Sequence, residues 1–289
     1  MPPFDPFGDD LADLKERATD PDPGIRRVAM MELAEEVGPD AKVLLLSGLA
    51  DPDPEVRAAA AKALDEHDGP DVVEGLVSSL EDPDAAVRQN AAEALAEKKE
   101  PSCGPLLIDR AQHSDPFVQA AALRALRELT LPDALAAALK ALQNDSAEVR
   151  REGLGVIGWL KAEEALPALI ATAADPDPSV RRATMSALVF VRPGGPGAAA
   201  LVAGLGAPHW QVRVKAANAL GRLKAASAIE ALGANLDNET SNVRKECAAA
   251  LGEIAAPQAL RWLEQAMDDP DPDVRKLIRW AIGRCQEAV

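Results

Sequence analysis

The chain has 289 residues, of which 47% are hydrophobic but only 3% are aromatic, and it contains no Tyr. Small apolar residues suit helices that pack closely with thin layers of side chains between them, which argues against one thick core. The formal net charge of −16 excludes wrapping along DNA or RNA phosphates and disfavours anionic lipid. The acidity lies in residues 1–144, with 29 Asp and Glu against 14 Lys and Arg, whereas residues 145–289 contain 18 against 17.

The cysteines and the N-terminus indicate in which cellular compartment the protein is expected. Cys103, Cys247 and Cys285 have no Cys-x-x-Cys spacing, so they predict neither a disulfide framework nor a zinc site but buried apolar side chains. The N-terminus has no basic region followed by an apolar run, and no stretch approaches the roughly 18 apolar residues of a membrane span. We therefore expect a cytoplasmic protein that does not insert into membranes.

A branched apolar residue recurs along the whole chain, 31 residues apart with one step of 32. Its positions are Ile25, Val56, Val87, Val118, Val149, Val180, Val212, Val243 and Val274. The next residue is Arg in every repeat except the fourth, which has Gln119. A fixed period of this length indicates stacked units that complete one another's core. The sequence thus predicts an all-α, right-handed α-solenoid of about nine two-helix repeats.

Loops rich in Asp and Pro precede the Val-Arg helices. In the loop before Val56, Asp53 is suited to be the N-cap and Pro54 the first helical residue, where the missing N–H costs nothing. The same device recurs at Asp22-Pro23, Asp177-Pro178 and Asp271-Pro272. These loops lack the central Gly and distal Glu of a calcium loop, so capping is the better interpretation. The Arg after each Val is expected to bond a loop Asp and tie neighbouring hairpins together.

We expect one solenoid over residues 1–289. Residues 1–38 would form an N-terminal capping repeat that begins with a helix containing Leu11 and Leu14, residues 39–256 the internal repeats, and residues 257–289 a C-terminal capping repeat. The last helix carries Lys276, Arg279 and Arg284, which would keep its outer face in water. Residues 192–197 hold the one-residue insertion and are too rich in Gly and Pro to be helical, so either a flexible joint or a lengthened turn is expected there.

The 31-residue period and the pattern Val-Arg-x-x-Ala-Ala-x-Ala-Leu-Gly resemble HEAT-like repeats of the phycobilin-lyase type and the idealised repeats of artificial HEAT-like binders. The resemblance covers nearly the entire chain. It implies that the Val-Arg helices line a concave groove. It also implies that the variable groove positions lie two and one before Val and at +2, +3, +6 and +10 after it.

The residues at these implied groove positions fall into two groups. The +10 positions of the first four repeats would form an acidic ladder of Glu35, Glu66, Glu97 and Glu128, or would be exposed Glu residues chosen only because they favour helices. Aromatic residues at groove positions are Phe117, Trp159, Phe190, Trp210 and Trp280, and polar residues around them are Arg151, Glu152, Arg182, Lys215, Asn218 and Arg222. An apolar centre with a polar rim is typical of a protein interface. The alternative is that the aromatic residues fill gaps between helices, especially Phe117 and Trp210, which are expected in loops.

Catalysis is disfavoured by the placement of the histidines. His67, His113 and His209 are predicted at a helix end and in two different loops, so a metal site or a nucleophile–base pair is not expected. We therefore predict a non-catalytic scaffold or adaptor that binds a partner protein or peptide in its groove, without a cofactor. The resemblance leaves one alternative, a phycobilin-lyase-like subunit or a cofactor-handling maturation chaperone. The partner's identity and the oligomeric state stay open.

Overall fold

The structure, a computed structural model, describes residues 8–36, 38–190 and 192–287. These ranges contain α-helices, short 3₁₀ turns and no strand. The even-numbered helices are α2 (Pro23–Leu33), α4 (Pro54–Ala63), α6 (Ala85–Ala96), α8 (Pro116–Leu129), α10 (Ala147–Leu160), α12 (Pro178–Ala187), α14 (Trp210–Arg222), α16 (Ser241–Ile254) and α18 (Pro272–Gln286). The odd-numbered helices are α1 (Gly8–Arg17), α3 (Pro39–Gly48), α5 (Pro70–Ser79), α7 (Gly104–Arg110), α9 (Leu135–Ala141), α11 (Leu166–Thr172), α13 (Pro196–Gly204), α15 (Ile229–Ala234) and α17 (Leu260–Gln265). The expected all-α solenoid of helical pairs is confirmed.

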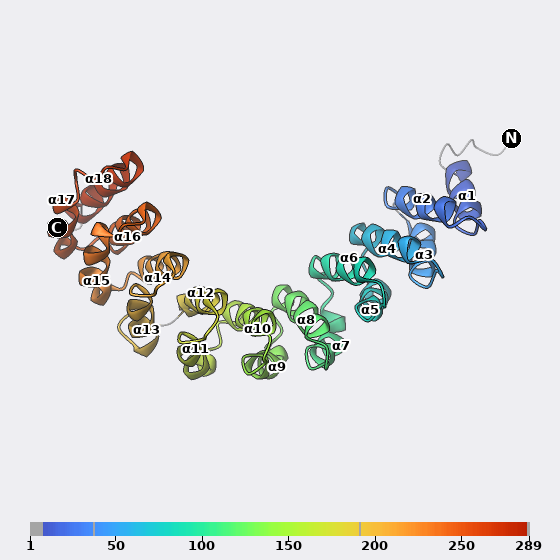
Figure 1. The fold of residues 1–289 in the computed structure, drawn as a ribbon, viewed down its shortest axis with the longest axis horizontal. Helices are drawn as coiled ribbons and strands as arrows, with labels where there is room; N and C mark the ends of the chain where they lie inside the picture. Colours follow the sequence, from blue (N-terminus) through green and yellow to red (C-terminus); the bar gives the residue numbers. More distant parts are fainter. Residues whose placement is uncertain (1–7, 37, 191, 288–289) are drawn as a thin grey trace. The chain divides into compact units, whose positions relative to one another are not determined.

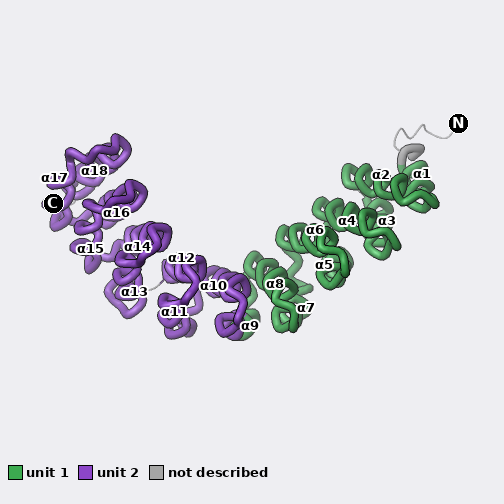
Figure 2. Tube along the Cα trace, in the orientation of Figure 1, with its two compact units in different colours: residues 1–137 green, residues 138–289 purple. Residues whose placement is uncertain are grey.

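The chain divides into two compact units, residues 1–137 and residues 138–289 (Figure 2). Their charges differ strongly. The first unit contains 29 Asp and Glu against 13 Lys and Arg, and the second contains 18 against 18. The formal net charge of −16 therefore belongs entirely to the first unit, and the second unit is neutral.

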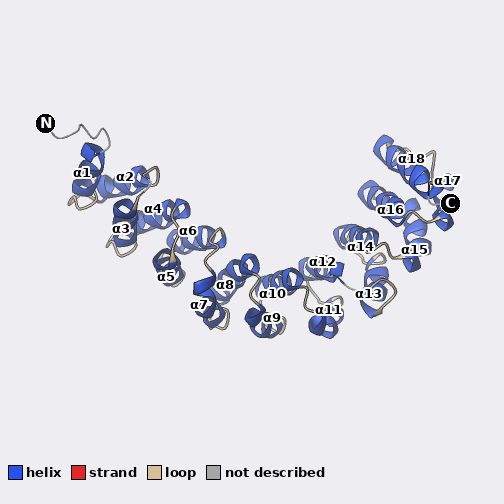
Figure 3. Ribbon diagram, turned by 180° about the vertical axis from the view of Figure 1, so that it is seen from behind, coloured by secondary structure: helices blue, strands red, loops and turns tan. Residues whose placement is uncertain are grey.

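Within each unit the helices form two rows (Figures 1 and 3). Even-numbered helices, here called the inner row, approach the next even-numbered helix closely, whereas odd-numbered helices, the outer row, lie farther apart. A stack whose two rows differ in spacing bends toward the closer row, so the inner row lines the concave side of each unit. Small residues permit the close approach, since a Cβ built on Gly221 of α14 would lie 2.8 Å from the Cα of Ala250 on α16.

Aspartate caps begin the inner helices as the loop pattern predicts. Asp22, Asp53, Asp177 and Asp271 each accept a hydrogen bond from a backbone N–H in the first turn, and Pro follows each of them. The carboxylate satisfies one N–H group that the helix leaves unpaired, and it lies at the positive end of the helix dipole. The N-cap role expected for these four residues is confirmed.

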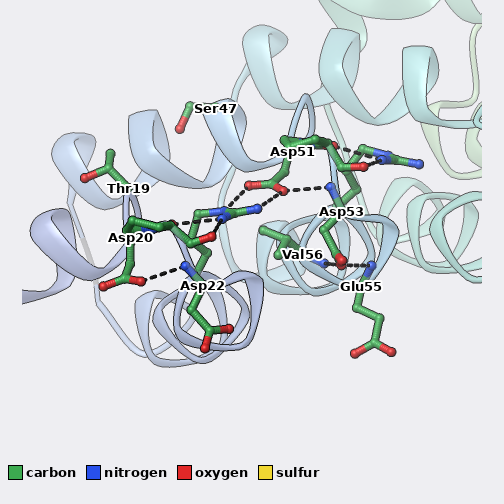
Figure 4. A network of polar contacts seen from close by, with 12 residues as sticks. Thr19, Asp20, Asp22, Ser47, Asp51, Asp53, Glu55 and Val56 are labelled. Carbon is green, nitrogen blue, oxygen red and sulfur yellow. Dashed lines mark hydrogen bonds and ion pairs between the residues drawn. The ribbon is translucent and has the colours of Figure 1, made fainter.

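Four Arg–Asp pairs link neighbouring repeats, and we call each pair a rung. In the second repeat, Arg57 Nε and Nη2 donate to both carboxylate oxygens of Asp82 at 2.7 and 3.0 Å, and Nη1 donates to the backbone carbonyl of Asp51 at 2.8 Å. The same carboxylate accepts the backbone N–H of Asp84 at 2.8 Å. Figure 4 shows the equivalent contacts around Asp51 and Asp53. The rungs are Arg26–Asp51, Arg57–Asp82, Arg150–Asp175 and Arg244–Asp269.

Three other repeats keep the arginine but have no carboxylate at the equivalent position of the next loop. Arg88 lies over the ring of Phe117, 5.9 Å from its centroid. Arg181 Nη2 lies 3.1 Å from His209 Nδ1. Arg213 Nη2 donates to the neutral Asn238 Oδ1 at 3.5 Å. The expectation of one ion pair in every repeat was therefore wrong, because the loop position opposite these arginines holds a residue without a carboxylate.

The core is thin and aliphatic. The branched repeat residue is at most 1% exposed in all repeats but the first, where Ile25 is 39% exposed because no even-numbered helix precedes α2 in the described part of the chain. Cys103, Cys247 and Cys285 are all buried as free thiols, as predicted. Burial raises the pKa of the Cys247 thiol to about 12, so it is protonated and unreactive at neutral pH.

One helix end offers a simple stability test. α16 is capped at its C-terminus by Ala255, whose φ of 51° lies in the left-handed region that favours glycine. We expect Ala255→Gly to raise the free energy of unfolding by about 0.5–1 kcal/mol, because the Cβ penalty disappears while the backbone N–H bond to Leu251 is kept. Urea unfolding followed by circular dichroism would measure this. The adjacent Ala256 has a φ of −110°, so Ala256→Gly should instead destabilise, and a gain in both variants would contradict the explanation.

Candidate protein-binding surface

Side chains of neighbouring inner helices meet at the implied groove positions. Asn218 Nδ2 donates to Glu246 Oε1 across α14 and α16 at 2.8 Å. Lys245 Nζ lies 3.2 Å from carboxylate oxygens of both Asp271 and Asp273. Hydrogen bonds to these two carboxylates raise the pKa of Lys245. The contacts show that surface positions of successive repeats lie close enough to touch along the inner row, although the paired positions are not equivalent ones.

Aromatic side chains of the second unit lie along this row and are partly open to solvent. Trp159 is 54% exposed at the end of α10, and Trp210 is 38% exposed as the first residue of α14. Trp280 of α18 is 41% exposed, with one side of its ring against Gly252 of α16. Phe190 is half-buried in the 3₁₀ turn η5 (Leu188–Phe190) that follows α12. A chain with so few aromatic residues thus exposes three tryptophans on one row.

Phe117 and Trp210 do not lie in loops. Phe117 is the second residue of α8 and Trp210 the first residue of α14, so the loop placement was wrong. The helix of the second repeat already begins two positions before Val, at Pro54, and Phe117 and Trp210 lie one and two positions before their own Val, so the loop placement was inconsistent with the repeat. Phe117 is half-buried beneath the guanidinium of Arg88, so a packing role accounts for it.

The polar residues expected around the aromatics differ in exposure. Arg182, Lys215 and Arg222 are exposed, as is Asn218 despite its bond to Glu246. Arg151 is half-buried and pairs with Glu148 at 3.6 Å and with Glu152 at 3.1 Å. Glu152 is only 6% exposed. A partner could therefore reach the first four side chains, but Glu152 lies inside the helix packing.

The acidic ladder lies in the first unit. Glu35, Glu66 and Glu97 are exposed, whereas Glu128 is half-buried and pairs with Arg127 at 3.2 Å. Glu35 and Glu66 also line a pocket of about 650 Å³ between α2 and α4. Met31, which was not among the predicted groove residues, is 58% exposed in this pocket. Its +6 position in the first repeat was the signal that could have found it.

The histidines have separate surroundings. His67 is buried, which lowers its pKa, and its Nε2 has no hydrogen-bond partner among the described atoms. His113 lies 3.6 Å from Glu81, and His209 contacts Arg181. No group of three or more His, Cys, Asp or Glu side chains that could hold a metal ion occurs in the described ranges.

The family follows from the repeats. A model of HEAT repeats matches residues 11–83, 73–154, 135–205 and 198–283, which together span most of the sequence. The chain is a HEAT-repeat protein. A search of curated protein sequences found no match. Among the described residues of this HEAT-repeat protein, none of the helices is both long and apolar enough to cross a membrane.

Solved structures share the fold. The HEAT-repeat protein is similar to an engineered protein, with 22% identity over 96% of this chain and 88% of that one and a TM-score of 0.53. Importin beta has 16% identity over 96% of this chain but 46% of its own, with a TM-score of 0.67. The complex of CpcE and CpcF of phycocyanin lyase from Nostoc sp. has 21% identity over 87% and 97%, with a TM-score of 0.50. At these identities the likeness shows the fold alone.

Proposed function

We propose that this HEAT-repeat protein is a non-catalytic scaffold or adaptor that holds a segment of a partner protein against the inner row of its second unit. The observation that carries the proposal is the exposure of Trp159, at 54% of its surface. Trp210 and Trp280, at 38% and 41%, extend the apolar surface along the same row. Large aromatic side chains bury much area and lose little side-chain entropy on binding, so exposed tryptophans are typical anchors of an interface.

Charged and polar side chains around these tryptophans would form the polar rim of the proposed interface. Arg182, Lys215 and Arg222 are exposed on α12 and α14, and Asn218 lies near them on α14. The proposed partner segment carries Leu, Phe or Met side chains for the tryptophans and carboxylates for the arginines and the lysine. The buried free cysteines support a cytoplasmic site of action.

The test is an affinity capture from native cell extract, comparing the wild-type protein with a Trp159→Ala/Phe190→Ala double variant by quantitative mass spectrometry. We expect one protein to be lost from the variant. With that protein purified, its affinity should fall at least about thirtyfold, because removing hot-spot aromatics costs about 2 kcal/mol or more. Helicity and cooperative unfolding should be kept, with only a modest loss of stability, since Trp159 is largely outside the core and Phe190 is half-buried.

A tryptophan of the outer row provides the matched control. Trp262 of α17 packs against Gly233 and contacts Arg261 at 5.2 Å from its ring, so Trp262→Ala should reduce stability but leave partner binding intact. Equal capture by wild type and the aromatic double variant would refute the proposed surface. Retention of a coloured small molecule by wild type, with no protein difference, would favour cofactor handling instead.

A further inference from the structure

A second surface lies in the first unit, in the pocket between the inner helices α2 and α4. Its volume is about 650 Å³, within the range of about 300–1,000 Å³ that is typical of ligand pockets. The lining residues are Arg27, Met31, Ala34, Glu35, Glu55, Ala58, Ala59, Lys62, Ala63, Asp65 and Glu66. The aromatic residues of the proposed scaffold surface all belong to the second unit, so this pocket is a separate site.

The floor of the pocket is apolar. Met31 is 58% exposed and lines the pocket together with Ala34, one turn later along α2. The facing residues Ala58 and Ala59 of α4 end at Cβ, which leaves the hollow open above them. Methionine is flexible and polarisable, so it adapts to apolar side chains of different shape. A large aliphatic side chain of a ligand that covers this exposed Met would remove apolar surface from water, which favours binding.

The walls of the pocket are acidic. Four carboxylates face two cations, and Arg27 already lies 3.7 Å from Glu55. Glu35 and Glu66 form no ion pair within the described part of the chain. The unit that contains the pocket carries the whole net charge of −16. An approaching segment is therefore attracted if it is basic and repelled if it is acidic, and the same field disfavours phosphate groups.

We propose that this pocket binds a peptide segment of a partner protein in which a Leu or Met side chain is flanked on both sides by Lys or Arg. The aliphatic side chain contacts Met31 and the facing alanines. The flanking cations lie against Glu35 and Glu66 at the rim. The proposal does not depend on the aromatic residues of the second unit.

The first part of the test uses synthetic peptides with an uncharged fluorophore, read by fluorescence anisotropy with the full-length protein. The probe is Ser-Gly-Lys-Arg-Leu-Arg-Lys-Gly-Ser, and two matched peptides replace Leu by Ala or every Lys and Arg by Glu. We expect the Ala peptide to bind about tenfold more weakly or worse, as loss of one buried Leu side chain predicts. The Glu peptide should not bind. Equal binding of the Leu and Ala peptides would overturn the proposal, because attraction by the acidic unit alone would then explain the affinity.

The second part changes the protein. Ala59→Leu fills the hollow and should abolish binding of the Leu peptide, while Glu35→Gln with Glu66→Gln should weaken it about threefold to tenfold without altering the core. Met267→Ala, at a methionine of the second unit that is 45% exposed, should have no effect. Unchanged affinity in both pocket variants would overturn the proposal.

The Trp159→Ala/Phe190→Ala variant separates this proposal from the scaffold surface of the second unit. We expect it to bind the Leu peptide as tightly as wild type. Loss of peptide binding in that variant would place the peptide on the aromatic surface and overturn the assignment to this pocket, without contradicting the proposed function.

Discussion

Replacing Asp269 by Ala is expected to lower the free energy of unfolding by about 3–5 kcal/mol, the range observed when one partner of a buried ion pair is removed. The side chains of Arg244 and Asp269 are 11% and 4% exposed, and their atoms meet at 2.6 and 3.0 Å. The variant leaves the Arg244 guanidinium buried, with only the bonds of Nη1 to backbone carbonyls remaining. Thermal unfolding by circular dichroism and hydrogen exchange in α16 and α18 would measure the loss.

Two control variants test whether the unpaired charge of Arg244 causes the expected loss of stability. Asp273 is 73% exposed and pairs with Lys245 at the surface, so Asp273→Ala should cost less than about 1 kcal/mol. An Arg244→Met/Asp269→Leu double variant removes both buried charges and should lose less stability than Asp269→Ala alone. A double variant as unstable as the single one would show that packing or the loop, rather than the unpaired charge, accounts for the effect.

Acid should destabilise the protein through the rung carboxylates Asp51, Asp82 and Asp269. Hydrogen bonds from Arg26 and Arg57 lower the pKa of Asp51 and Asp82 below the ordinary 3.8. Burial acts in the opposite direction on Asp269, but the bonds from Arg244 and from the Asp271 N–H outweigh it, so this pKa is also lowered. A carboxyl with a lower pKa in the folded than in the unfolded state stabilises fully above the unfolded value. That stability is lost as the pH falls through the folded value.

We expect two phases in urea unfolding midpoints measured from pH 7 to pH 2. Between about pH 7 and pH 4.5, stability should change little, because the weaker repulsion within the acidic first unit is opposed by protonation of the buried His67, whose pKa is lowered in the folded protein. Below the ordinary carboxyl pKa of 3.8 it should fall steeply as Asp51, Asp82 and Asp269 are protonated. An Arg57→Met/Asp82→Leu variant should show a shallower fall. A steep loss already between pH 7 and pH 5 would contradict the carboxylate explanation.

Structural features that depend on residues close together in the sequence could be predicted. An N-cap such as Asp53 needs only its own loop and the next turn, so the helix starts follow from the order of Asp and Pro along the chain. The buried valines and the free, buried cysteines follow from the 31-residue period and from composition. The rungs were expected from the recurring arginine, but the interruptions at Arg88 and Arg181 show that a rung also needs a carboxylate in the next loop.

The surfaces were harder to predict, because exposure depends on neighbours from other repeats. Glu152 and Trp159 both occupy implied groove positions, yet Glu152 is 6% exposed and Trp159 is 54% exposed. Ile25 resembles the other repeat residues in sequence but is 39% exposed, since its repeat lies at the end of the described stack. Pattern alone does not distinguish such positions.

The repeat, the helix starts, the family and the uneven distribution of charge could be predicted, because they depend on residues close together along the chain or on simple counts. Which arginines pair with a carboxylate and which tryptophans are exposed became evident only in the folded stack. The same holds for the pocket with acidic walls that Met31, Ala58 and Ala59 line. These features arise where successive repeats meet, and the distance between two inner helices depends on the side chains of both.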